Sequence, residues 1–435
     1  MKQSEFKKRR HLLMQQIGTG NIAIIASASS AVRNRDVHYP FRQDSDFYYL
    51  TGFNEADALA VFIPGREQGE YVLFCREYDA TKALWEGAHA GLEGATTHYG
   101  ADDAFPIDDL DEILPGMLEN KAKVFYPMGK NGELDHKLLD WINHIRKQSR
   151  SGVTAPGELV SLEHIVHEMR LFKSSEEIKL MKRAAEISAQ AHVRAMQYCQ
   201  PGVHEFEIEA ELIHQFMCSG LRAVAYPSIV AGGKNACVLH YTENADKLRK
   251  GDLLLIDAGA ECDHYAADIT RTFPVSGKFT EPQRLLYQLV LDAQEAALAE
   301  IAPGKAWNKA HEASVEVLTK GLVELGLLKG RVKKLIKEEK YKQFYMHRIG
   351  HWLGMDVHDV GDYKIKDEWR LLEPGMVLTV EPGLYVAADC QNVDKQWRGI
   401  GIRIEDDVLV TADGYEILTA SVPKTVEAIE AVMRS

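Results

Sequence analysis

The sequence predicts two domains, an α/β domain at the N-terminus and an α+β domain that contains two related halves. The chain has 435 residues, more than one hydrophobic core usually supports. Strand-like and helical runs alternate over residues 1–165. Further on, the segments KGDLLLIDAG (250–259) and PGMVLTVEPG (374–383) share one layout. We therefore expect domains at 1–165 and 166–435.

The composition excludes several classes of function. Hydrophobic residues make up 46% of the chain and charged residues 26%, as in ordinary globular proteins. The formal net charge of −13 argues against a general nucleic-acid or anionic-membrane surface, which would need clustered positive charge. The six cysteines form no C-x-x-C pair and indicate reduced thiols. We expect a cytoplasmic protein with no nucleic-acid and no membrane partner.

The first domain begins with a segment that loosely mimics a signal peptide. The basic run KKRR (7–10) precedes apolar residues, but glutamines, glycines and an asparagine interrupt the apolar run. We predict instead a helix over 4–17 and a buried strand over 21–27. The same patterns predict further elements, namely strands at 58–65, 71–77 and 123–129 and a helix at 134–148.

The second domain opens with helices. Ser174 and Glu177 form a capping-box pattern at the start of a long helical stripe. A second helix is expected over 205–220, where Gly220 ends it. A third begins at Pro282 and runs to about residue 301. The remainder after residue 222 has strand character.

The shared layout of 250–259 and 374–383 places a carboxylate at the end of each apolar strand. Asp257 corresponds to Glu381, and the flanking glycines correspond as Gly251 to Gly375 and Gly259 to Gly383. Coincidence between two ordinary strand-turn segments is the alternative, because short apolar runs are common. If the correspondence is real, the domain consists of two related halves.

Two further carboxylates follow these strands. Asp268 lies eleven residues after Asp257, which is long enough for a hairpin that returns beside it. Glu405 lies in the strand-like segment GIRIEDDVLV (401–410). Each carboxylate taken alone could cap a turn or face solvent. Together they would repel one another unless a cation lay between them.

Three histidines crowd the segment MHRIGHWLGMDVHDVG (346–361). His347 and His351 have the spacing of a zinc-protease helix, but Arg348 replaces the glutamate of H-E-x-x-H and Gly350 indicates turns. One histidine added to four carboxylates is too rich in oxygen for a structural zinc site. That set suits a pair of divalent cations such as Mn²⁺.

These blocks resemble a known family. The segments 253–280, 346–361, 372–385 and 401–411 are similar to the aminopeptidase P branch of the creatinase/prolidase superfamily, and residues 33–62 resemble its N-terminal domain. The resemblance implies a creatinase-like N-terminal domain and a pita-bread catalytic domain with internal pseudo-twofold symmetry. It implies two divalent cations, usually manganese, with Asp268 and Glu405 bridging, Asp257 chelating one cation, and His351 and Glu381 completing the other.

The resemblance also implies roles around the metals. His240 and His358 match histidines near the substrate, Tyr226 and Arg403 match positions around the metal site, and Trp85 loosely matches a tryptophan that reaches a neighbouring subunit's active site. Glu381 would act as general base. The implied activity is removal of the first residue from peptides with proline second, by a hydroxide held between the metals, in a homodimer or homotetramer. One departure stands out: Arg348-Ile349 occupies a place where the family often has Gly-Leu.

Other functions remain open at this stage. A prolidase would cut only Xaa-Pro dipeptides, with organophosphate hydrolysis as a possible side activity. A non-catalytic binding module would not need the five ligands. Methionine aminopeptidase would not need the N-terminal domain, and creatinase lacks the metal ligands.

Overall fold

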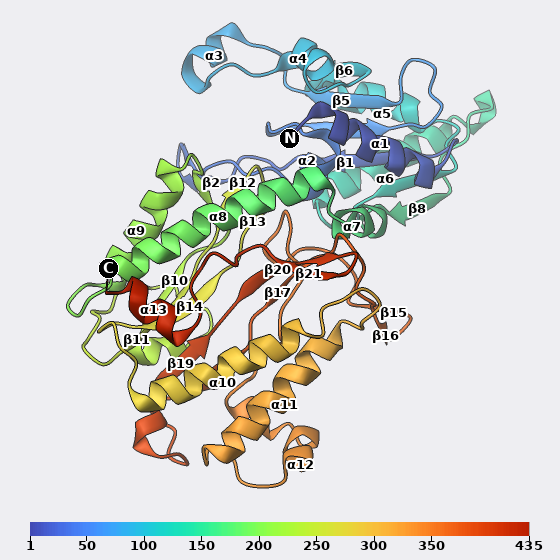
Figure 1. Ribbon diagram of the computed structural model, residues 1–435. Helices are drawn as coiled ribbons and strands as arrows, with labels where there is room; N and C mark the ends of the chain where they lie inside the picture. Colours follow the sequence, from blue (N-terminus) through green and yellow to red (C-terminus); the bar gives the residue numbers. More distant parts are fainter. Residues whose placement is uncertain (435) are drawn as a thin grey trace. The chain divides into compact units, whose positions relative to one another are not determined.

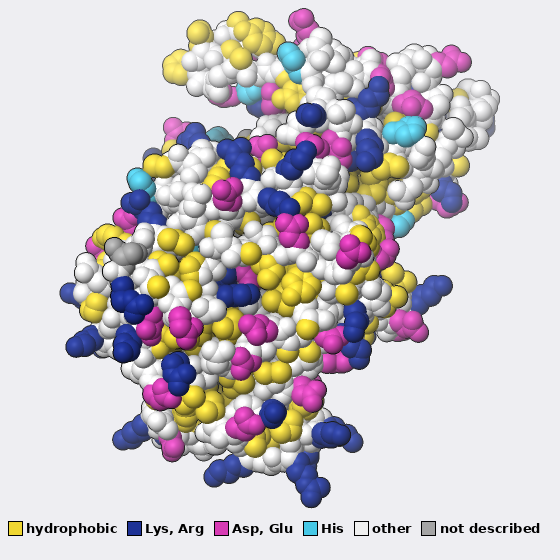
Figure 2. Space-filling model, in the orientation of Figure 1, with side chains coloured by type: hydrophobic (Ala, Val, Ile, Leu, Met, Phe, Trp, Pro, Cys, Tyr) yellow, Lys and Arg dark blue, Asp and Glu magenta, His cyan; other side chains and the backbone are white. Residues whose placement is uncertain are grey.

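The computed structural model describes residues 1–434 and divides into two units, Met1–Arg170 and Leu171–Ser435 (Figure 1). The sequence placed the boundary between 165 and 166. Within the described residues, no helix has the length and apolar character needed to cross a membrane. Acidic and basic side chains are interspersed over the face drawn in Figure 2.

The N-terminal unit contains a mixed six-stranded sheet in the order β6-β5-β4-β1-β7-β8. Its strands pair antiparallel from β1 through β4 to β5 and parallel at β1–β7, β5–β6 and β7–β8. The four expected strands are confirmed as β1, β4, β5 and β7. The bounds are β1 Ile22–Ala26, β4 Leu59–Phe62, β5 Tyr71–Cys75, β6 Asp103–Pro106, β7 Lys123–Tyr126 and β8 Glu158–Ser161, with a small hairpin of β2 Val32–Asn34 and β3 Val37–His38.

Helices accompany this sheet. The expected helices are confirmed as α1 (Gln3–Ile17) and α6 (Gly132–Lys147). Leu138, Trp141 and Ile145 on one face of α6 are buried in the core formed with the strands, as a 3.6-residue period predicts. The other helices are α2 Ser45–Thr51, α3 Ala80–Glu86, α4 Gly91–Thr97, α5 Leu110–Leu118 and α7 Glu163–Leu171.

The C-terminal unit repeats one arrangement of four strands. In the first half, β11 pairs with β14 while the shorter strands β12 and β13 pair with each other between them. In the second half, β17 pairs with β20 and β18 with β19 in the same nested order. The repeated sequence layout therefore reflects a repeated fold. The bounds are β11 Leu253–Asp257, β12 Ala260–Cys262, β13 Tyr265–Ala266, β14 Thr270–Pro274, β17 Val377–Val380, β18 Gly383–Val386, β19 Ile400–Arg403 and β20 Asp406–Thr411.

The backbone explains why glycine occupies three of the matched positions in the two halves. Gly251 and Gly375 both have φ of +94°, a conformation that side chains disfavour, where the chain turns into each first strand. Gly259 lies where an added Cβ would come within 1.7 Å of Ala267 O, so the two arms of the hairpin approach too closely for any side chain.

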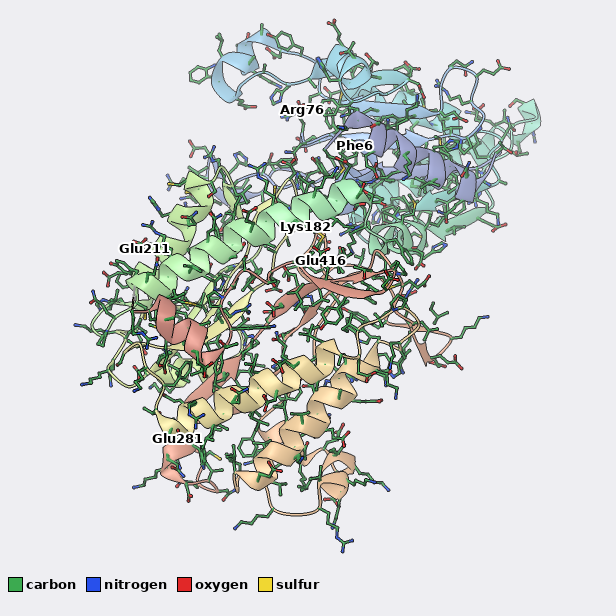
Figure 3. The ribbon with its side chains drawn as sticks, in the orientation of Figure 1. Phe6, Arg76, Lys182, Glu211, Glu281 and Glu416 are labelled. Atoms are coloured by element: carbon green, nitrogen blue, oxygen red, sulfur yellow. The ribbon has the colours of Figure 1, made fainter. Side chains whose placement is uncertain are left out.

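Helices flank the strands, with α8 (Ser175–Tyr198) on one side and α10 (Glu281–Leu298) with α11 (Asn308–Glu324) on the other (Figure 1). The three expected helices are confirmed as α8 (Ser175–Tyr198), α9 (Glu205–Cys218) and α10 (Glu281–Leu298), and both residues of the Ser174–Glu177 capping box make their bonds. Lys182 of α8 pairs with Glu416 of β21 at 2.6 Å (Figure 3). The remaining strands are β9 Ala223–Val224, β10 Ile229–Gly232, β15 Lys364–Ile365, β16 Glu368–Trp369 and β21 Gly414–Ile417.

The prediction of strand character for the rest of the domain missed part of its structure. Three further helices form: α11 (Asn308–Glu324), α12 (Val332–Lys337) and α13 (Val426–Val432). Valine, threonine and glycine weaken the intrinsic preference of α11 for helix. Packing overrides that preference, because Gly321 leaves the space that Leu289 of α10 fills.

Candidate metal centre and active site

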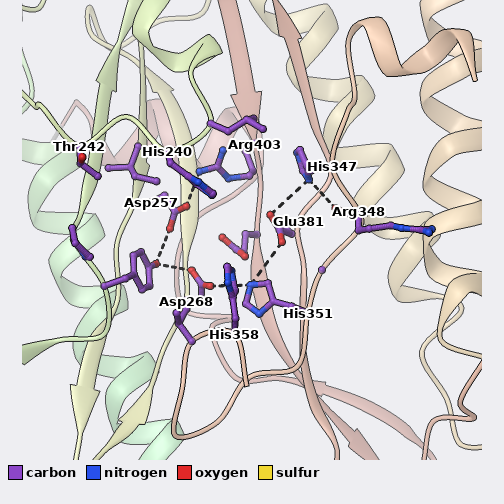
Figure 4. A pocket seen from close by; sticks show the side chains of 17 residues that line it. His240, Thr242, Asp257, Asp268, His347, Arg348, His351, His358, Glu381 and Arg403 are labelled. Atoms are coloured by element: carbon purple, nitrogen blue, oxygen red, sulfur yellow. Dashed lines mark hydrogen bonds and ion pairs between the residues drawn. The ribbon is translucent and has the colours of Figure 1, made fainter. Parts of the chain in front are cut away.

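A cavity of about 410 Å³ opens in the C-terminal unit (Figure 4). Its lining brings together nearly all the residues that the sequence singled out, from segments more than 170 positions apart: Tyr226, His240, Asp257, Asp268, His351, His358, Glu381, Arg403 and Glu405. Trp85 is not among the lining residues. It lies on α3 of the N-terminal unit, where 87% of its surface is exposed, so its role stays a prediction.

The nested hairpins position the four carboxylates. Asp257 is the last residue of β11. Asp268 lies two positions before the first residue of β14. Glu381 directly follows β17 and Glu405 directly precedes β20. Each half therefore supplies one carboxylate where its first long strand ends and one where its last strand begins. Because paired strands run antiparallel, these two points lie side by side.

A backbone contact places His351 beside the carboxylates. The segment 349–351 runs along β17, where Glu381 N donates to Ile349 O at 2.7 Å and Thr379 N donates to His351 O at 2.9 Å. Gly350 is required in this approach, because a Cβ there would lie 2.0 Å from Thr379 O. The segment is therefore extended and turn-rich, and the expectation that its glycines exclude a helix is confirmed.

The donor set fits a hard cation. Ligand atoms of Asp268, His351 and Glu405 lie within 4.8 Å of one another. His351 Nε2 lies 3.3 Å from Asp268 Oδ2 and 3.8 Å from Glu381 Oε1. Carboxylate oxygens with one imidazole nitrogen are ligands that divalent cations of the manganese type accept. The residues present therefore fit a metal site.

Crowding of buried acidic groups perturbs their protonation. Burial raises the pKa of Glu405 well above its usual range, and the charges of Asp268 and Glu381 add to this. Burial likewise raises the pKa of Glu381 to about 7, although His351 and Arg403 oppose the shift. Repulsion of this kind is what a bound cation relieves.

The pKa of His351 is also raised, which in an imidazole favours the charged form. Burial alone would lower its pKa, but the hydrogen bond and charge of Asp268, with the charge of Glu381, raise it to about 9. The imidazole therefore carries a proton at neutral pH when no other cation neutralises these carboxylates. A metal ion and that proton compete for the same site, because an imidazole binds metals only when deprotonated.

Arg403 and Tyr226 hold the carboxylates in place. Arg403 Nη2 donates to Asp257 Oδ2 at 2.6 Å, and Arg403 Nε donates to Thr270 Oγ1 at 3.0 Å. Tyr226 Oη lies 2.7 Å from Asp257 Oδ1 and 2.6 Å from Asp268 Oδ1. Thr270 Oγ1 in turn donates to Glu405 Oε2 at 2.6 Å. Such partners fix the orientation of metal-ligating groups.

Two of these positioning residues were not found from the sequence. Thr270 was not singled out, although its place two positions after Asp268 puts both side chains on one face of an extended chain. Tyr385 is the last residue of the family-like segment 372–385, but nothing in the sequence indicated its role. Its hydroxyl accepts from Arg403 Nη1 at 3.1 Å and lies 2.9 Å from His347 Nε2.

The three histidines of 346–361 separate in space. His347 lines the cavity, and burial lowers its pKa to about 3, so it is neutral. The rings of His351 and His358 meet edge to face, with centroids 4.3 Å apart. Burial lowers the pKa of His358, and His240 lies across the carboxylate cluster from His347 (Figure 4).

The chain resembles known proteins over nearly its whole length. Residues 179–412 match metallopeptidase family M24, and residues 6–126 match the aminopeptidase P N-terminal domain. Xaa-Pro aminopeptidase of Escherichia coli strain K12 is 46% identical over 99% of this chain and 97% of its own length. Human Xaa-Pro aminopeptidase 3 is 32% identical over 99% of this chain and 86% of its own.

Comparison with solved structures also points to aminopeptidase P proteins. Aminopeptidase PepP of Pseudomonas aeruginosa superposes with a TM-score of 0.99 at 57% identity, covering 100% of this chain and 98% of that one. E. coli aminopeptidase P with the inhibitor Pro-Leu gives 0.96 at 46% identity, covering 100% and 98%. These matches confirm the expected pita-bread catalytic domain and N-terminal aminopeptidase P domain. The chain therefore belongs to metallopeptidase family M24, on its aminopeptidase P branch.

Proposed function

We propose that this protein is a metal-dependent aminopeptidase that removes the first residue of peptides whose second residue is proline. The observation that carries the proposal is the convergence of four carboxylates and one imidazole in a single cavity. The chain's relatives are named Xaa-Pro aminopeptidases, and a related structure holds the dipeptide Pro-Leu as an inhibitor.

We infer that two divalent cations bind, with Mn²⁺ the best fit. Four carboxylates carry more negative charge than one divalent ion would neutralise. We assign Asp268 and Glu405 as bridging ligands, Asp257 to one cation, and His351 with Glu381 to the other. When bound, such cations supply a hydroxide at neutral pH and Lewis-acid stabilisation of a carbonyl oxygen.

The side chains of the protein would then transfer protons and orient the substrate and the metal ligands. Glu381 would accept the proton of the attacking water on a carboxylate oxygen and deliver it to the proline nitrogen. That nitrogen leaves only when protonated, because the free amide anion is too strong a base to be expelled. His240 and His358 would donate hydrogen bonds to the substrate carbonyl. Arg403 would hold Asp257, and Tyr226 would lie at the substrate side of the metals.

The proposal also covers the domain bounds, the cellular location and the oligomeric state of the protein. We assign residues 1–165 and 166–435 to the two domains of the family, and the cytoplasm as the location, because the described cysteines form no disulfide. A homodimer or homotetramer, with Trp85 reaching a neighbouring active site, is the assembly that the resemblance favours.

The test combines substrate length with metal removal. The Mn²⁺-loaded protein should hydrolyse Ala-Pro-Ala faster than Ala-Ala-Ala or the dipeptide Ala-Pro. Chelation should abolish hydrolysis of Ala-Pro-Ala, and Mn²⁺ should restore it. Full activity of the metal-free protein would contradict the metal assignment, and a preference for Ala-Pro would favour a prolidase-type dipeptidase.

A further inference from the structure

Arg348 is a charged cavity residue that the proposed mechanism leaves without a role. It lines the same cavity as the carboxylates. Its side chain extends away from them on the side of His347, while His240 and Thr242 lie across the cluster (Figure 4). Its position therefore suits contact with a part of the substrate beyond the reacting bond.

An aromatic ring holds Arg348 at this edge of the cavity. The guanidinium lies over the ring of Trp369, 5.4 Å from its centroid. The ammonium of Lys364 lies over the same ring at 4.7 Å, because Lys364 and Trp369 are opposite one another in the β15–β16 hairpin. Trp369 is half-buried and packs against the core around Trp352. A fixed indole thus orients two cationic side chains.

Neither cation is neutralised by a carboxylate that the structure describes. Among residues 1–434, no carboxylate forms an ion pair with Arg348 or Lys364. Both side chains are exposed to solvent. Exposed cations are common and usually only solvated. Two unpaired cations on one ring at the edge of an active-site cavity, in a chain of net charge −13, form a local positive site.

We propose that Arg348, supported by Trp369 and Lys364, binds a carboxylate of the substrate downstream of the proline. This inference rests on the proposed aminopeptidase function. The substrate's free amine would lie among the carboxylates that hold the metals, and an extended peptide advances by at most about 3.3–3.6 Å per residue away from them. The third or fourth residue then reaches beyond the metals. A guanidinium there recognises a carboxylate, either the peptide's C-terminus or an acidic side chain.

The experiment compares matched peptides on the Mn²⁺-loaded protein. One arm uses Ala-Pro-Ala and Ala-Pro-Ala-Ala, each as free acid and as C-terminal amide. The other uses amidated Ala-Pro-Ala-Glu and Ala-Pro-Ala-Gln, which separates a side-chain carboxylate from the terminal one. In at least one arm, kcat/KM should be about three- to tenfold higher for the charged peptide, as for a partly exposed charged hydrogen bond. Raising the ionic strength should reduce this ratio.

Variants assign the effect to Arg348. R348Q should bring the charged-to-neutral ratio close to one, R348K should retain part of it, and R348E should invert it. R331Q removes an exposed arginine outside the cavity and should leave the ratio unchanged. If R348Q does not fold, R348K, R348E and the salt dependence of the unmodified protein still decide the matter.

Two results would overturn the inference: a ratio of one at every length in the unmodified protein, or a ratio that R348Q and R348E leave intact. Loss of all hydrolysis of Xaa-Pro peptides by the unmodified, metal-loaded protein is a different failure. It would contradict the proposed function itself, since the amidated peptides test that function without any downstream carboxylate.

Discussion

Glu381 lies between charges of both signs, and this environment sets its proton affinity. His351 Nε2 is 3.8 Å from its Oε1, while Asp268 and Asp257 are close enough to repel a proton-free carboxylate. Without a bound cation, burial and the two aspartates raise the pKa of Glu381 to about 7, although His351 and Arg403 oppose the shift.

Replacement of this side chain by a neutral one of the same shape tests the proposed role. Glu381→Gln should lower kcat on Ala-Pro-Ala by about a hundred- to ten-thousand-fold, the usual contribution of a general acid–base group, with larger losses where metal is also lost. Circular dichroism and metal content should be measured beside the rate. Glu373→Gln changes an exposed glutamate earlier in the same segment and should leave the rate unaffected. Turnover within a factor of ten of the unmodified protein would exclude Glu381 as the proton carrier.

Some residues of the site could be predicted from the sequence and others could not. Asp257 and Glu381 could be predicted because each ends an apolar run, where a charge is unusual. Thr270 and Tyr385 could not, because hydroxyl side chains are common in strands. Their partners Arg403 and Glu405 are distant in sequence and meet them only in the folded chain. Among three consecutive acidic residues, only the fold separates Glu405 in the cavity from Asp406, which pairs with Arg271.

At the scale of elements, two nested hairpins carry all four carboxylates of the site. Their first strands could be predicted from the repeated layout, and α8 from its capping box. The nesting could not, because strands as short as β12 and β13 have too few residues for a periodic pattern. Helix α11 was missed because its glycine and β-branched residues suit packing on α10 better than they suit an isolated helix.

The glycines of the first hairpin give a matched test of this arrangement. Gly259→Ala would force a Cβ to within 1.7 Å of Ala267 O, so backbone must move, at a cost of about 3 kcal/mol or more. Gly251→Ala meets open space and suffers only from its φ of +94°, at about 1 kcal/mol. Urea unfolding of both variants measures the difference. Equal losses of unfolding free energy would show that the hairpin arms can separate without cost.

At the scale of the whole molecule, the helical layer is joined to the catalytic strands by a buried histidine. His192 of α8 is fully buried, and its Nε2 donates at 3.0 Å to the carbonyl oxygen of Ala258, the residue after Asp257 of the cavity. Burial lowers the pKa of His192 to about 4, and Arg271 adds to this against the opposing effects of Ala258 and Asp268. The C-terminal unit is therefore built around an imidazole that must stay neutral.

This predicts a defined loss of stability in acid. The unfolded chain takes up a proton on His192 near its ordinary pKa of about 6.5, whereas the folded chain does so only near pH 4. The contribution of His192 to the unfolding free energy is thus complete above pH 6.5. It is lost between pH 6.5 and pH 4, by about 3 kcal/mol.

His192→Gln should remove that pH dependence, so the unfolding free energy of this variant should fall less than that of the unmodified protein between pH 6.5 and pH 4. The comparison is made by urea unfolding at each pH, because the other titrating groups are common to both proteins and cancel in the difference. His214→Gln, which changes an exposed histidine on α9, should follow the unmodified protein. Parallel curves for His192→Gln and the unmodified protein would show that His192 already carries a proton in the folded state.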